Sequence, residues 1–336
     1  MHDDSIFLNQ SESFFPPSPK VLQAISNILS KVNRYPQTQS ENLRHKLAEY
    51  TKTSPSQIIV GNGSDDIIEL IIRVLVNSDD QVLIPVPSFP WYWYASKNLN
   101  KNHVFIYSDR EYNFNINSIL ENISSSVKLI FIANPNNPTG KIIKRQELIK
   151  LIENSNCFVV IDECYYEFCQ ETIIDLVKTY SNLIVIRSFS KGFALAGLRI
   201  GYAVMNDELA SSLRVKMQLF GVNSIAQAAA IAALSDIDYY QMQINSLLNQ
   251  KEFLKNELLK MNFDVCQSYT NFLFVGTKKL GILAKDLVEE LKQKNLYVKD
   301  CSMLPGVDKY HFRTSVGNWF ENEMILTQLN IATQFK

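Results

Sequence analysis

Short apolar runs alternate with amphipathic stretches through the first two thirds of the chain. Apolar runs of about four to eight residues bounded by turn residues are typical of buried strands, and an apolar period of about 3.6 residues is typical of helices. We expect strands at 58–60, 81–84, 104–107, 130–133, 159–162 and 184–186, and helices near 40–50 and 65–76. Such alternation predicts an α/β fold with a mostly parallel sheet covered on both faces.

Two other parts of the chain differ from this alternation. Residues 1–33 are a polar, proline-bearing lead and an amphipathic stretch, which we interpret as a lid plus a small-domain helix. Beyond residue 206 the pattern is mostly helical and then gives strands near 272–275 and 310–313. We therefore expect a large domain over 34–220 and a smaller α+β domain over 221–336.

Length, charge and cysteine content narrow the class of protein. A chain of 336 residues with 46% hydrophobic content can bury a large core and normally divides into two domains. The net charge of −1 and the lack of basic runs argue against nucleic acid or an anionic membrane as partners. Five cysteines without a CxxC pair indicate a reduced, cytoplasmic setting and no metal site. The acidic start, Met1–Ser5, and the absence of a long apolar run predict neither export nor a membrane span.

One lysine follows the apolar run that ends near residue 187. Lys191 can form a Schiff base with a carbonyl cofactor if burial and nearby cations lower its pKa. Ser188, Ser190 and Arg199 would suit the phosphate of such a cofactor. A lysine between a strand and a helix is more often a solvated loop residue, so this interpretation depends on its partners.

Candidate partners follow two earlier strands. Asp162 ends the 159–162 run, where open α/β sheets place functional side chains, and a carboxylate there would keep a pyridinium nitrogen protonated. Tyr165 is a phenol that could hydrogen-bond the ring oxygen of pyridoxal phosphate, and Asn137, fixed by Pro138, could donate to the same oxygen. Taken singly, each motif is explained about as well by caps and turns.

A glycine turn supplies a further anion-binding candidate. Residues 61–66, Gly-Asn-Gly-Ser-Asp-Asp, follow a strand and open a helix, so backbone N–H groups there face any anion at the helix start. A glycine turn of this kind is usually structural. The interpretation as a phosphate site is favoured because Ser190 and Arg199 would contact the phosphate from the side opposite the helix start.

Together these motifs resemble a known family, the fold type I pyridoxal-phosphate enzymes. The residues that carry the resemblance are Asn137-Pro138-Thr139-Gly140, Asp162 with Tyr165, Ser190-Lys191 and Arg199. Within that family the chain is most similar to the histidinol-phosphate aminotransferases, through residues 34–36, 61–66 and 193–199. The resemblance runs from Leu8 to Gly317. It implies a seven-stranded, mostly parallel sheet between helices in the large domain, a smaller α+β domain, and pyridoxal 5'-phosphate as cofactor.

The resemblance also assigns further cofactor contacts. It implies that the Ser64 and Asp65 amides bind the cofactor phosphate and that Phe89 stacks on the cofactor ring. Tyr35 looks like the residue that family members lend to the cofactor phosphate of a neighbouring subunit. The protein is therefore expected to be a homodimer with a shared active site.

Substrate contacts are implied at four positions. Arg313 resembles the arginine that binds the substrate anion, and Lys299 stands where the subfamily usually has a second basic residue, an arginine. Tyr92 and Asn9 are expected on the substrate side. Residues 9–13, Asn-Gln-Ser-Glu-Ser, depart from the subfamily's Asn-Glu-Asn-Pro-like stretch. Lys299 and residues 9–13 thus depart from the subfamily pattern in the expected substrate-binding region and not in the expected cofactor-binding region.

The implied reaction is transamination in histidine biosynthesis. L-Histidinol phosphate and 2-oxoglutarate would give imidazole acetol phosphate and L-glutamate, with Lys191 moving the proton and Asp162 holding the ring nitrogen protonated. Two alternatives stay open: a transaminase of another phosphorylated ketone, such as a triose phosphate, and a pyridoxal-phosphate decarboxylase of a phosphorylated amino acid. A non-enzymatic binding module is disfavoured because Lys191, Asp162 and Asn137 are all present.

Overall fold

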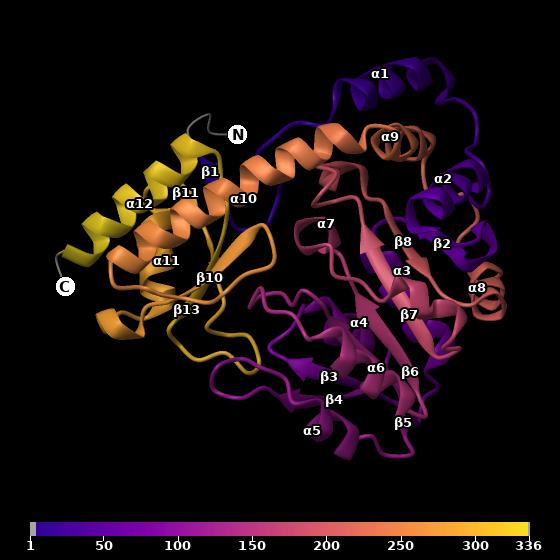
Figure 1. Cartoon of the computed structure of the whole chain (residues 1–336), viewed down its shortest axis with the longest axis horizontal. Coiled ribbons are helices and arrows are strands. Elements are labelled where there is room, and N and C mark those ends of the chain that lie inside the picture. The colour runs from indigo at the N-terminus through magenta and orange to yellow at the C-terminus, as the bar shows by residue number, and fades with distance from the viewer. Residues whose placement is uncertain (1–4, 335–336) are drawn as a thin grey trace.

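A seven-stranded sheet forms the larger part of the computed structural model, which describes residues 5–334 (Figure 1). The strands lie in the order β2, β8, β7, β6, β5, β3, β4, and β8 runs antiparallel to both of its neighbours while the other pairs are parallel. The strands are β2 (Ile58–Gly61), β3 (Gln81–Val86), β4 (Asn102–Tyr107), β5 (Val127–Ala133), β6 (Phe158–Asp162), β7 (Leu183–Ser188) and β8 (Gly201–Val204). The predicted mostly parallel sheet is confirmed.

Helices cover both faces of this sheet because successive strand side chains point to opposite sides. Val159 and Ile161 face one core with α1, α2, α5, α6, α7 and α9, whereas Val160 faces the other core with α3, α4 and α8. The helices are α1 (Pro19–Ile28), α2 (Glu41–Thr51), α3 (Ser64–Leu75), α4 (Trp91–Asn98), α5 (Ile116–Glu121), α6 (Arg145–Glu153), α7 (Tyr166–Cys169), α8 (Asp207–Arg214) and α9 (Ser224–Leu234).

The smaller part is built on an antiparallel sheet in the order β12, β13, β10, β9, of which Figure 1 labels β10 and β13. Its elements are β9 (Asp264–Val265), β10 (Phe272–Gly276), β12 (Lys299–Asp300), β13 (His311–Ser315), α11 (Ala284–Lys292) and α12 (Trp319–Gln334). The long helix α10 (Ile237–Lys260) joins the two parts, because Tyr240 is buried in the core of the large sheet and Leu254 in the small core. The expected α+β character of this region is confirmed.

The N-terminal segment divides between the two parts. Strand β1 (Ile6–Phe7) pairs in parallel with β11 (Leu296–Tyr297) of the smaller part. Helix α1, by contrast, packs against α9, and its buried Val21 belongs to the core of the large sheet. The expectation of a small-domain helix within residues 1–33 is thus not met for α1. The domain boundaries themselves stay predictions.

Strand register brings the predicted site residues to one edge of the large sheet. Asp162 at the end of β6 lies between Ala133 of β5 and Ile186 of β7. On the next strand pair, Ser188 of β7 is opposite Gly201 of β8. Gly201 in turn is opposite Gly61 of β2, and a Cβ on Gly201 would collide with the backbone nitrogen that opens α3. The carboxyl ends of β5, β6 and β7 therefore meet the start of α3.

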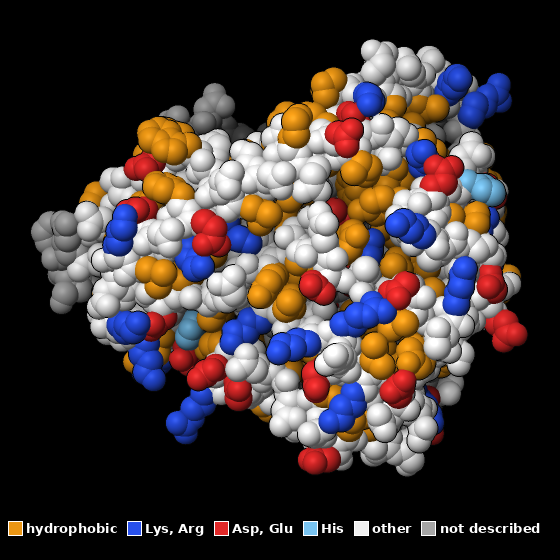
Figure 2. All heavy atoms as spheres, in the orientation of Figure 1, with side chains coloured by type: hydrophobic (Ala, Val, Ile, Leu, Met, Phe, Trp, Pro, Cys, Tyr) orange, Lys and Arg blue, Asp and Glu red, His pale blue; other side chains and the backbone are white. Residues whose placement is uncertain are grey.

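Surface charge, membrane-spanning helices and metal-ligand clusters are other features that would indicate partners and ligands. On the face drawn in Figure 2, acidic and basic side chains are interspersed, so this face has no broad patch of one sign. Within residues 5–334, no helix combines the length and apolar character that crossing a membrane requires. The same range has no cluster of three or more His, Cys, Asp or Glu side chains that could hold a metal ion. Residues 1–4 of the acidic start lie outside the described part.

Candidate active site

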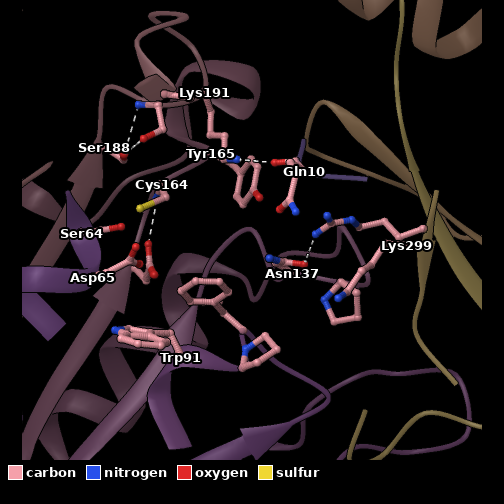
Figure 3. Close-up of a pocket in the computed structure, with 18 of the residues that line it drawn as sticks. Gln10, Ser64, Asp65, Trp91, Asn137, Cys164, Tyr165, Ser188, Lys191 and Lys299 are labelled. Atoms are coloured by element: carbon pink, nitrogen blue, oxygen red, sulfur yellow. Dashed lines mark hydrogen bonds between the residues drawn. The ribbon is translucent and has the colours of Figure 1, made fainter. Parts of the chain in front are cut away.

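A cavity of about 670 Å³ opens at the carboxyl ends of these strands (Figure 3). Its walls come from the large sheet, from β12, β13 and the loop between them, and from the 9–13 segment. Most of the predicted residues line it: Asn9, Ser64, Asp65, Phe89, Tyr92, Asn137, Asp162, Tyr165, Ser188, Ser190, Lys191, Arg199, Lys299 and Arg313. Tyr35 is the exception.

Lys191 occupies the turn after β7 and points toward the 9–13 segment (Figure 3). Its Nζ donates to the carbonyl oxygen of Gln10 at 2.7 Å, and its own carbonyl accepts from the Ser13 hydroxyl at 2.6 Å. Burial, and next the charge of Arg313, lower the pKa of Lys191 to about 8. A lysine amine of this kind is partly neutral near physiological pH and is able to act as a nucleophile or base.

Asp162 is the buried acid of the cavity. One carboxylate oxygen accepts from the Tyr92 hydroxyl at 2.6 Å and the other from the Cys164 backbone N–H at 3.0 Å. Burial raises the pKa of Asp162, and these hydrogen bonds oppose that shift. A cationic ring nitrogen placed against this carboxylate would be held protonated.

Tyr92 lies closer to the acid than the sequence suggested. The side chain is fully buried, stacks on Phe131 at 4.6 Å between ring centroids, and donates a hydrogen bond from its hydroxyl to Asp162. We predicted Tyr92 on the substrate side, but its hydroxyl is occupied by the carboxylate. Phe89 and Tyr92 are three residues apart, Phe89 just before α4 and Tyr92 in its first turn, and this spacing is the signal that could have placed both against the same site.

Replacing Tyr92 with phenylalanine should lower the turnover number about ten-fold and leave the fold intact. The hydroxyl helps hold Asp162 ionised, and a hydrogen bond to a charged group contributes about 1.5–3 kcal/mol. Steady-state kinetics with circular dichroism would measure both effects. Tyr94→Phe is the matched control, since Tyr94 also lines the cavity but is half-exposed. Equal rates in both variants would contradict this role for Tyr92.

An anion-binding end forms where α3 begins. Gly63 precedes the helix with φ +88°, a conformation that favours glycine, and the guanidinium of Arg199 lies directly over it. Arg199 also pairs with the Asp65 carboxylate at 2.7 Å, and the hydroxyls of Ser188 and Ser190 hydrogen-bond each other at 3.0 Å. Free helix N–H groups, two hydroxyls and a guanidinium form a donor set suited to a phosphate.

The opposite end of the cavity carries Arg313. Its two terminal nitrogens donate to the Asn137 side-chain oxygen and to the Asn9 carbonyl oxygen, both at 2.6 Å. Its Nε is buried and has no hydrogen-bond partner among residues 5–334. Lys299, on neighbouring β12, is exposed and also lines the cavity (Figure 3). The cavity therefore has a second basic end, separate from the one at α3.

Two aromatic residues complete the middle of the cavity. Phe89 lies edge-on to Tyr92, with ring centroids 5.6 Å apart, and presents a flat wall. Tyr165 is buried edge-on against Phe272, and burial, opposed by the charge of Arg313, raises its pKa to about 12. Tyr165 is thus a neutral hydrogen-bonding phenol at physiological pH.

Tyr35 lies outside this cavity. It is 83% exposed and stacks on Phe220, with ring centroids 4.6 Å apart. Within one chain it contacts none of the site, so its contribution to the neighbouring subunit stays a prediction. The exposed Tyr35 ring is available for contact with a partner, whereas Phe220 is half-buried.

Sequence reasoning missed the backbone groups of the 9–13 segment. The carbonyls of Asn9, Gln10 and Ser11 accept from Arg313, Lys191 and Asn271, respectively. Backbone acceptors leave no residue-type signal, so no motif could have indicated them. The segment closes the cavity over the lysine.

Comparison with known proteins agrees with this geometry. The family model described as aminotransferase class I and II matches residues 3–329. The chain is 36% identical to the histidinol-phosphate aminotransferase of Thermoanaerobacter pseudethanolicus over 96% of its length and 91% of the relative's. It is 32% identical to that of Methanosphaera stadtmanae, over 96% and 88%.

A solved structure gives the same result. The histidinol-phosphate aminotransferase of Sinorhizobium meliloti in complex with pyridoxal-5'-phosphate superposes with a TM-score of 0.93 at 25% identity, over 98% of this chain and 91% of that one. The fold, the cavity and the sequence therefore indicate the same family. The chain belongs to the aminotransferase class I and II family.

Proposed function

We propose that the protein is a pyridoxal 5'-phosphate-dependent aminotransferase that exchanges L-histidinol phosphate and 2-oxoglutarate for imidazole acetol phosphate and L-glutamate. The observation that carries this proposal is the cavity itself, in which Lys191 and buried Asp162 lie between two separate basic ends. One basic end suits the phosphate of the cofactor and the other suits the phosphate of the substrate. The whole-length similarity to histidinol-phosphate aminotransferases supports the choice of substrate.

The residues present fit the cofactor. Ser64, Asp65, Ser188, Ser190 and Arg199 would hold its phosphate at the start of α3. Asp162 would pair with the ring nitrogen, Asn137 and Tyr165 would bind the ring oxygen, and Phe89 would stack on the ring. The chemistry supplied by bound pyridoxal phosphate is an aldehyde that condenses with amines and a ring that takes up negative charge.

Four side chains would carry the reaction. Lys191 would bind the cofactor covalently, be displaced by the incoming amine, and then move the proton from the substrate carbon as a neutral amine of lowered pKa. Asp162 would keep the ring nitrogen protonated, and Tyr92 would keep Asp162 ionised. Tyr165, a neutral phenol, would donate to the ring oxygen. The 9–13 segment would limit access of water to the site.

Substrate binding would use the second basic end. Arg313 would bind the phosphate, or the carboxylate of L-glutamate, with Lys299 as a second positive charge. A lysine ammonium is a point charge, whereas an arginine guanidinium can form two parallel hydrogen bonds. Lys299 would therefore hold a phosphate less rigidly than an arginine. Asn9 has a buried side-chain oxygen without a partner among the described residues, which suits a donor group on the substrate.

We also propose a cytoplasmic homodimer in which Tyr35 reaches the cofactor phosphate of the partner subunit. The exposure of Tyr35, which is 83% accessible and stacks on half-buried Phe220, supports this assignment, because its ring is free to contact a partner. The five free cysteines are compatible with a reducing compartment.

Visible spectra of the cofactor-loaded protein would test the substrate. L-Histidinol phosphate and, separately, L-glutamate should each convert the cofactor from its aldehyde to its amine form, with imidazole acetol phosphate found as product. In Lys299→Ala the KM for L-histidinol phosphate should rise about ten-fold, because one charge contact to the phosphate is lost. The KM for L-glutamate should change less.

The same experiment separates the alternatives. Conversion only by another phosphorylated amine would reassign the substrate within the aminotransferases. Release of carbon dioxide from a phosphorylated amino acid, without need for 2-oxoglutarate, would replace transamination by decarboxylation. No spectral change with any amine would contradict the proposed function as a whole.

A further inference from the structure

A buried carboxyl group lies directly against the residue that follows Lys191. Glu167, on α7, is only 8% exposed. A Cβ added to Gly192 would lie 2.5 Å from the Cβ of Glu167 and 2.9 Å from its Oε2. Lys191 lines the cavity and Glu167 does not, so Glu167 touches the lysine turn from outside the cavity. The absence of a side chain at residue 192 allows this close approach.

The carboxyl group of Glu167 is only weakly hydrogen-bonded. Its Oε1 accepts from the Tyr50 hydroxyl at 3.4 Å, and its Oε2 has no partner among the residues that the structure describes. The Tyr50 ring also lies edge-on to Phe193, with ring centroids 5.9 Å apart. Tyr50 and Glu167 together thus border the segment just after Lys191. An ionised carboxylate in this place would lack the donors that it requires.

Arg187, whose charge lowers the pKa of Glu167, is already paired. Arg187 on β7 forms an ion pair with Glu163 at 2.9 Å and donates to the Thr172 hydroxyl at 2.7 Å. Both members of the ion pair are at least 97% buried. One guanidinium therefore faces two carboxyl groups, and Glu163 has the direct contact. Glu167 is the carboxyl that the cluster can hold more easily as a neutral acid.

The surroundings of Glu167 favour its protonated form. Burial raises the pKa of Glu167 to about 7, opposed by the charge of Arg187 and the hydrogen bond from Tyr50. The charge of Glu163, the residue after β6, adds to the upward shift of the Glu167 pKa. Tyr202, on β8, also faces the group, and the charge of Glu167 contributes to the raised pKa of that phenol. On the elements packed around Glu167, Tyr50 of α2 and Tyr202 of β8 present phenols and the residue after β6 presents Glu163. The cations are Arg187 on β7 and buried Lys251 on α10, which packs against α7.

We propose that Glu167 is a positioning residue for Lys191, which it supports from outside the cavity. Its side chain fills the space against Gly192, while the Ser13 hydroxyl holds the Lys191 carbonyl at 2.6 Å. The lysine backbone is therefore fixed by two contacts that do not touch the reacting atoms. This inference rests on the covalent role of Lys191 in the proposed function.

Two substitutions at residue 167 test the positioning role. Glu167→Gln keeps the shape of the neutral acid and should leave the turnover number within about two-fold of wild type. Glu167→Ala keeps the Cβ but removes the Cγ and the carboxyl group that border Gly192. It should lower the turnover number roughly 10- to 100-fold, with the KM for the amine donor unchanged, because a misplaced lysine reacts more slowly. The pH at which the absorbance of the lysine-bound cofactor changes should shift in the alanine variant alone.

Exposed Glu171→Gln, four residues away, is the control and should behave as wild type. Undiminished turnover in Glu167→Ala would overturn the proposal. Equal damage in Glu167→Gln and Glu167→Ala would also overturn it, because a charge and not a neutral group would then be required.

Thermal unfolding of the cofactor-free protein gives a test that needs no substrate. The pKa of Glu167 is raised in the folded state above its ordinary 4.5, so its stabilising effect is complete below pH 4.5 and is lost as pH rises through about 7. Between pH 5 and pH 8 the melting temperature of Glu167→Gln should therefore rise by roughly 3–6 °C relative to wild type. A pH-independent difference would refute the neutral carboxyl even if the substrate assignment held. The expected slope would stand even if L-histidinol phosphate proved not to be the substrate.

Discussion

Lys191→Ala should abolish both amino-group transfer and covalent attachment of the cofactor, with turnover reduced at least about ten-thousand-fold. The pKa of Lys191 is lowered from 10.5 to about 8. At pH 7 about one lysine in ten is then neutral, against roughly one in three thousand without the shift. The visible spectrum of the purified variant and its steady-state rate would measure the two losses.

Wild-type protein should show a matching pH dependence. Because only the neutral amine attacks a carbonyl, the rate of cofactor attachment to the cofactor-free protein should rise about ten-fold per pH unit below pH 8 and level off above it. Stopped-flow absorbance at several pH values would follow this rate. Full turnover in Lys191→Ala would remove the lysine from the mechanism.

A second buried lysine provides the control. Lys251 on α10 is 5% exposed, and burial also lowers its pKa to about 8. Its Nζ, however, donates to the carbonyl oxygens of Ser268 and Thr270, and Lys251 does not line the cavity. A lowered pKa alone therefore does not identify a catalytic lysine. Lys251→Met should retain cofactor attachment and turnover.

The site residues at the ends of the strands can be predicted from the sequence. Asp162 and Lys191 both follow long runs of buried aliphatic residues, and the turn chemistry after each run is visible in residue types. Parallel pairing of β5, β6 and β7 then brings their carboxyl ends together without further information. The α/β fold and the cofactor end of the site are therefore readable from local pattern.

The contacts that depend on tertiary packing are not visible in this pattern. Helix α1 has the amphipathic character of a helix in either domain, and only its contact with α9 decides between them. Buried Lys251 and Arg187 look like ordinary surface residues because their types are usually exposed. Contacts of this kind join residues that are far apart in sequence, so they cannot be predicted from local periodicity.

Two adjacent acids at the end of β6 illustrate this limit. Asp162 and Glu163 are neighbours, and from the sequence we assign Asp162 to the cofactor but predict no role for Glu163. In the structure Glu163 turns away from the cavity to pair with Arg187, and Asp162 lines the cavity. The alternation of side chains along a strand thus assigns one acid to packing and the other to chemistry.

Asp162→Asn should lower turnover roughly a thousand-fold while the protein still folds and binds the cofactor. An amide of the same shape cannot balance a protonated ring nitrogen, and loss of one partner of a buried ion pair costs about 3–5 kcal/mol. The Tyr92 hydroxyl can turn from donor to acceptor, so the amide can still be accommodated. Single-turnover rates with L-glutamate and cofactor titration would separate chemistry from binding.

The control for this variant is Asp175→Asn, which removes a carboxylate from an exposed ion pair with Arg145. Exposed pairs contribute little, so its turnover should match wild type. An unimpaired single-turnover rate in Asp162→Asn would show that the ring nitrogen is not held by this carboxylate. Loss of cofactor binding with normal chemistry in the bound fraction would assign Asp162 to binding alone. A slow reaction with the cofactor fully bound is the outcome that a buried acid, set between Tyr92 and the Cys164 N–H, predicts.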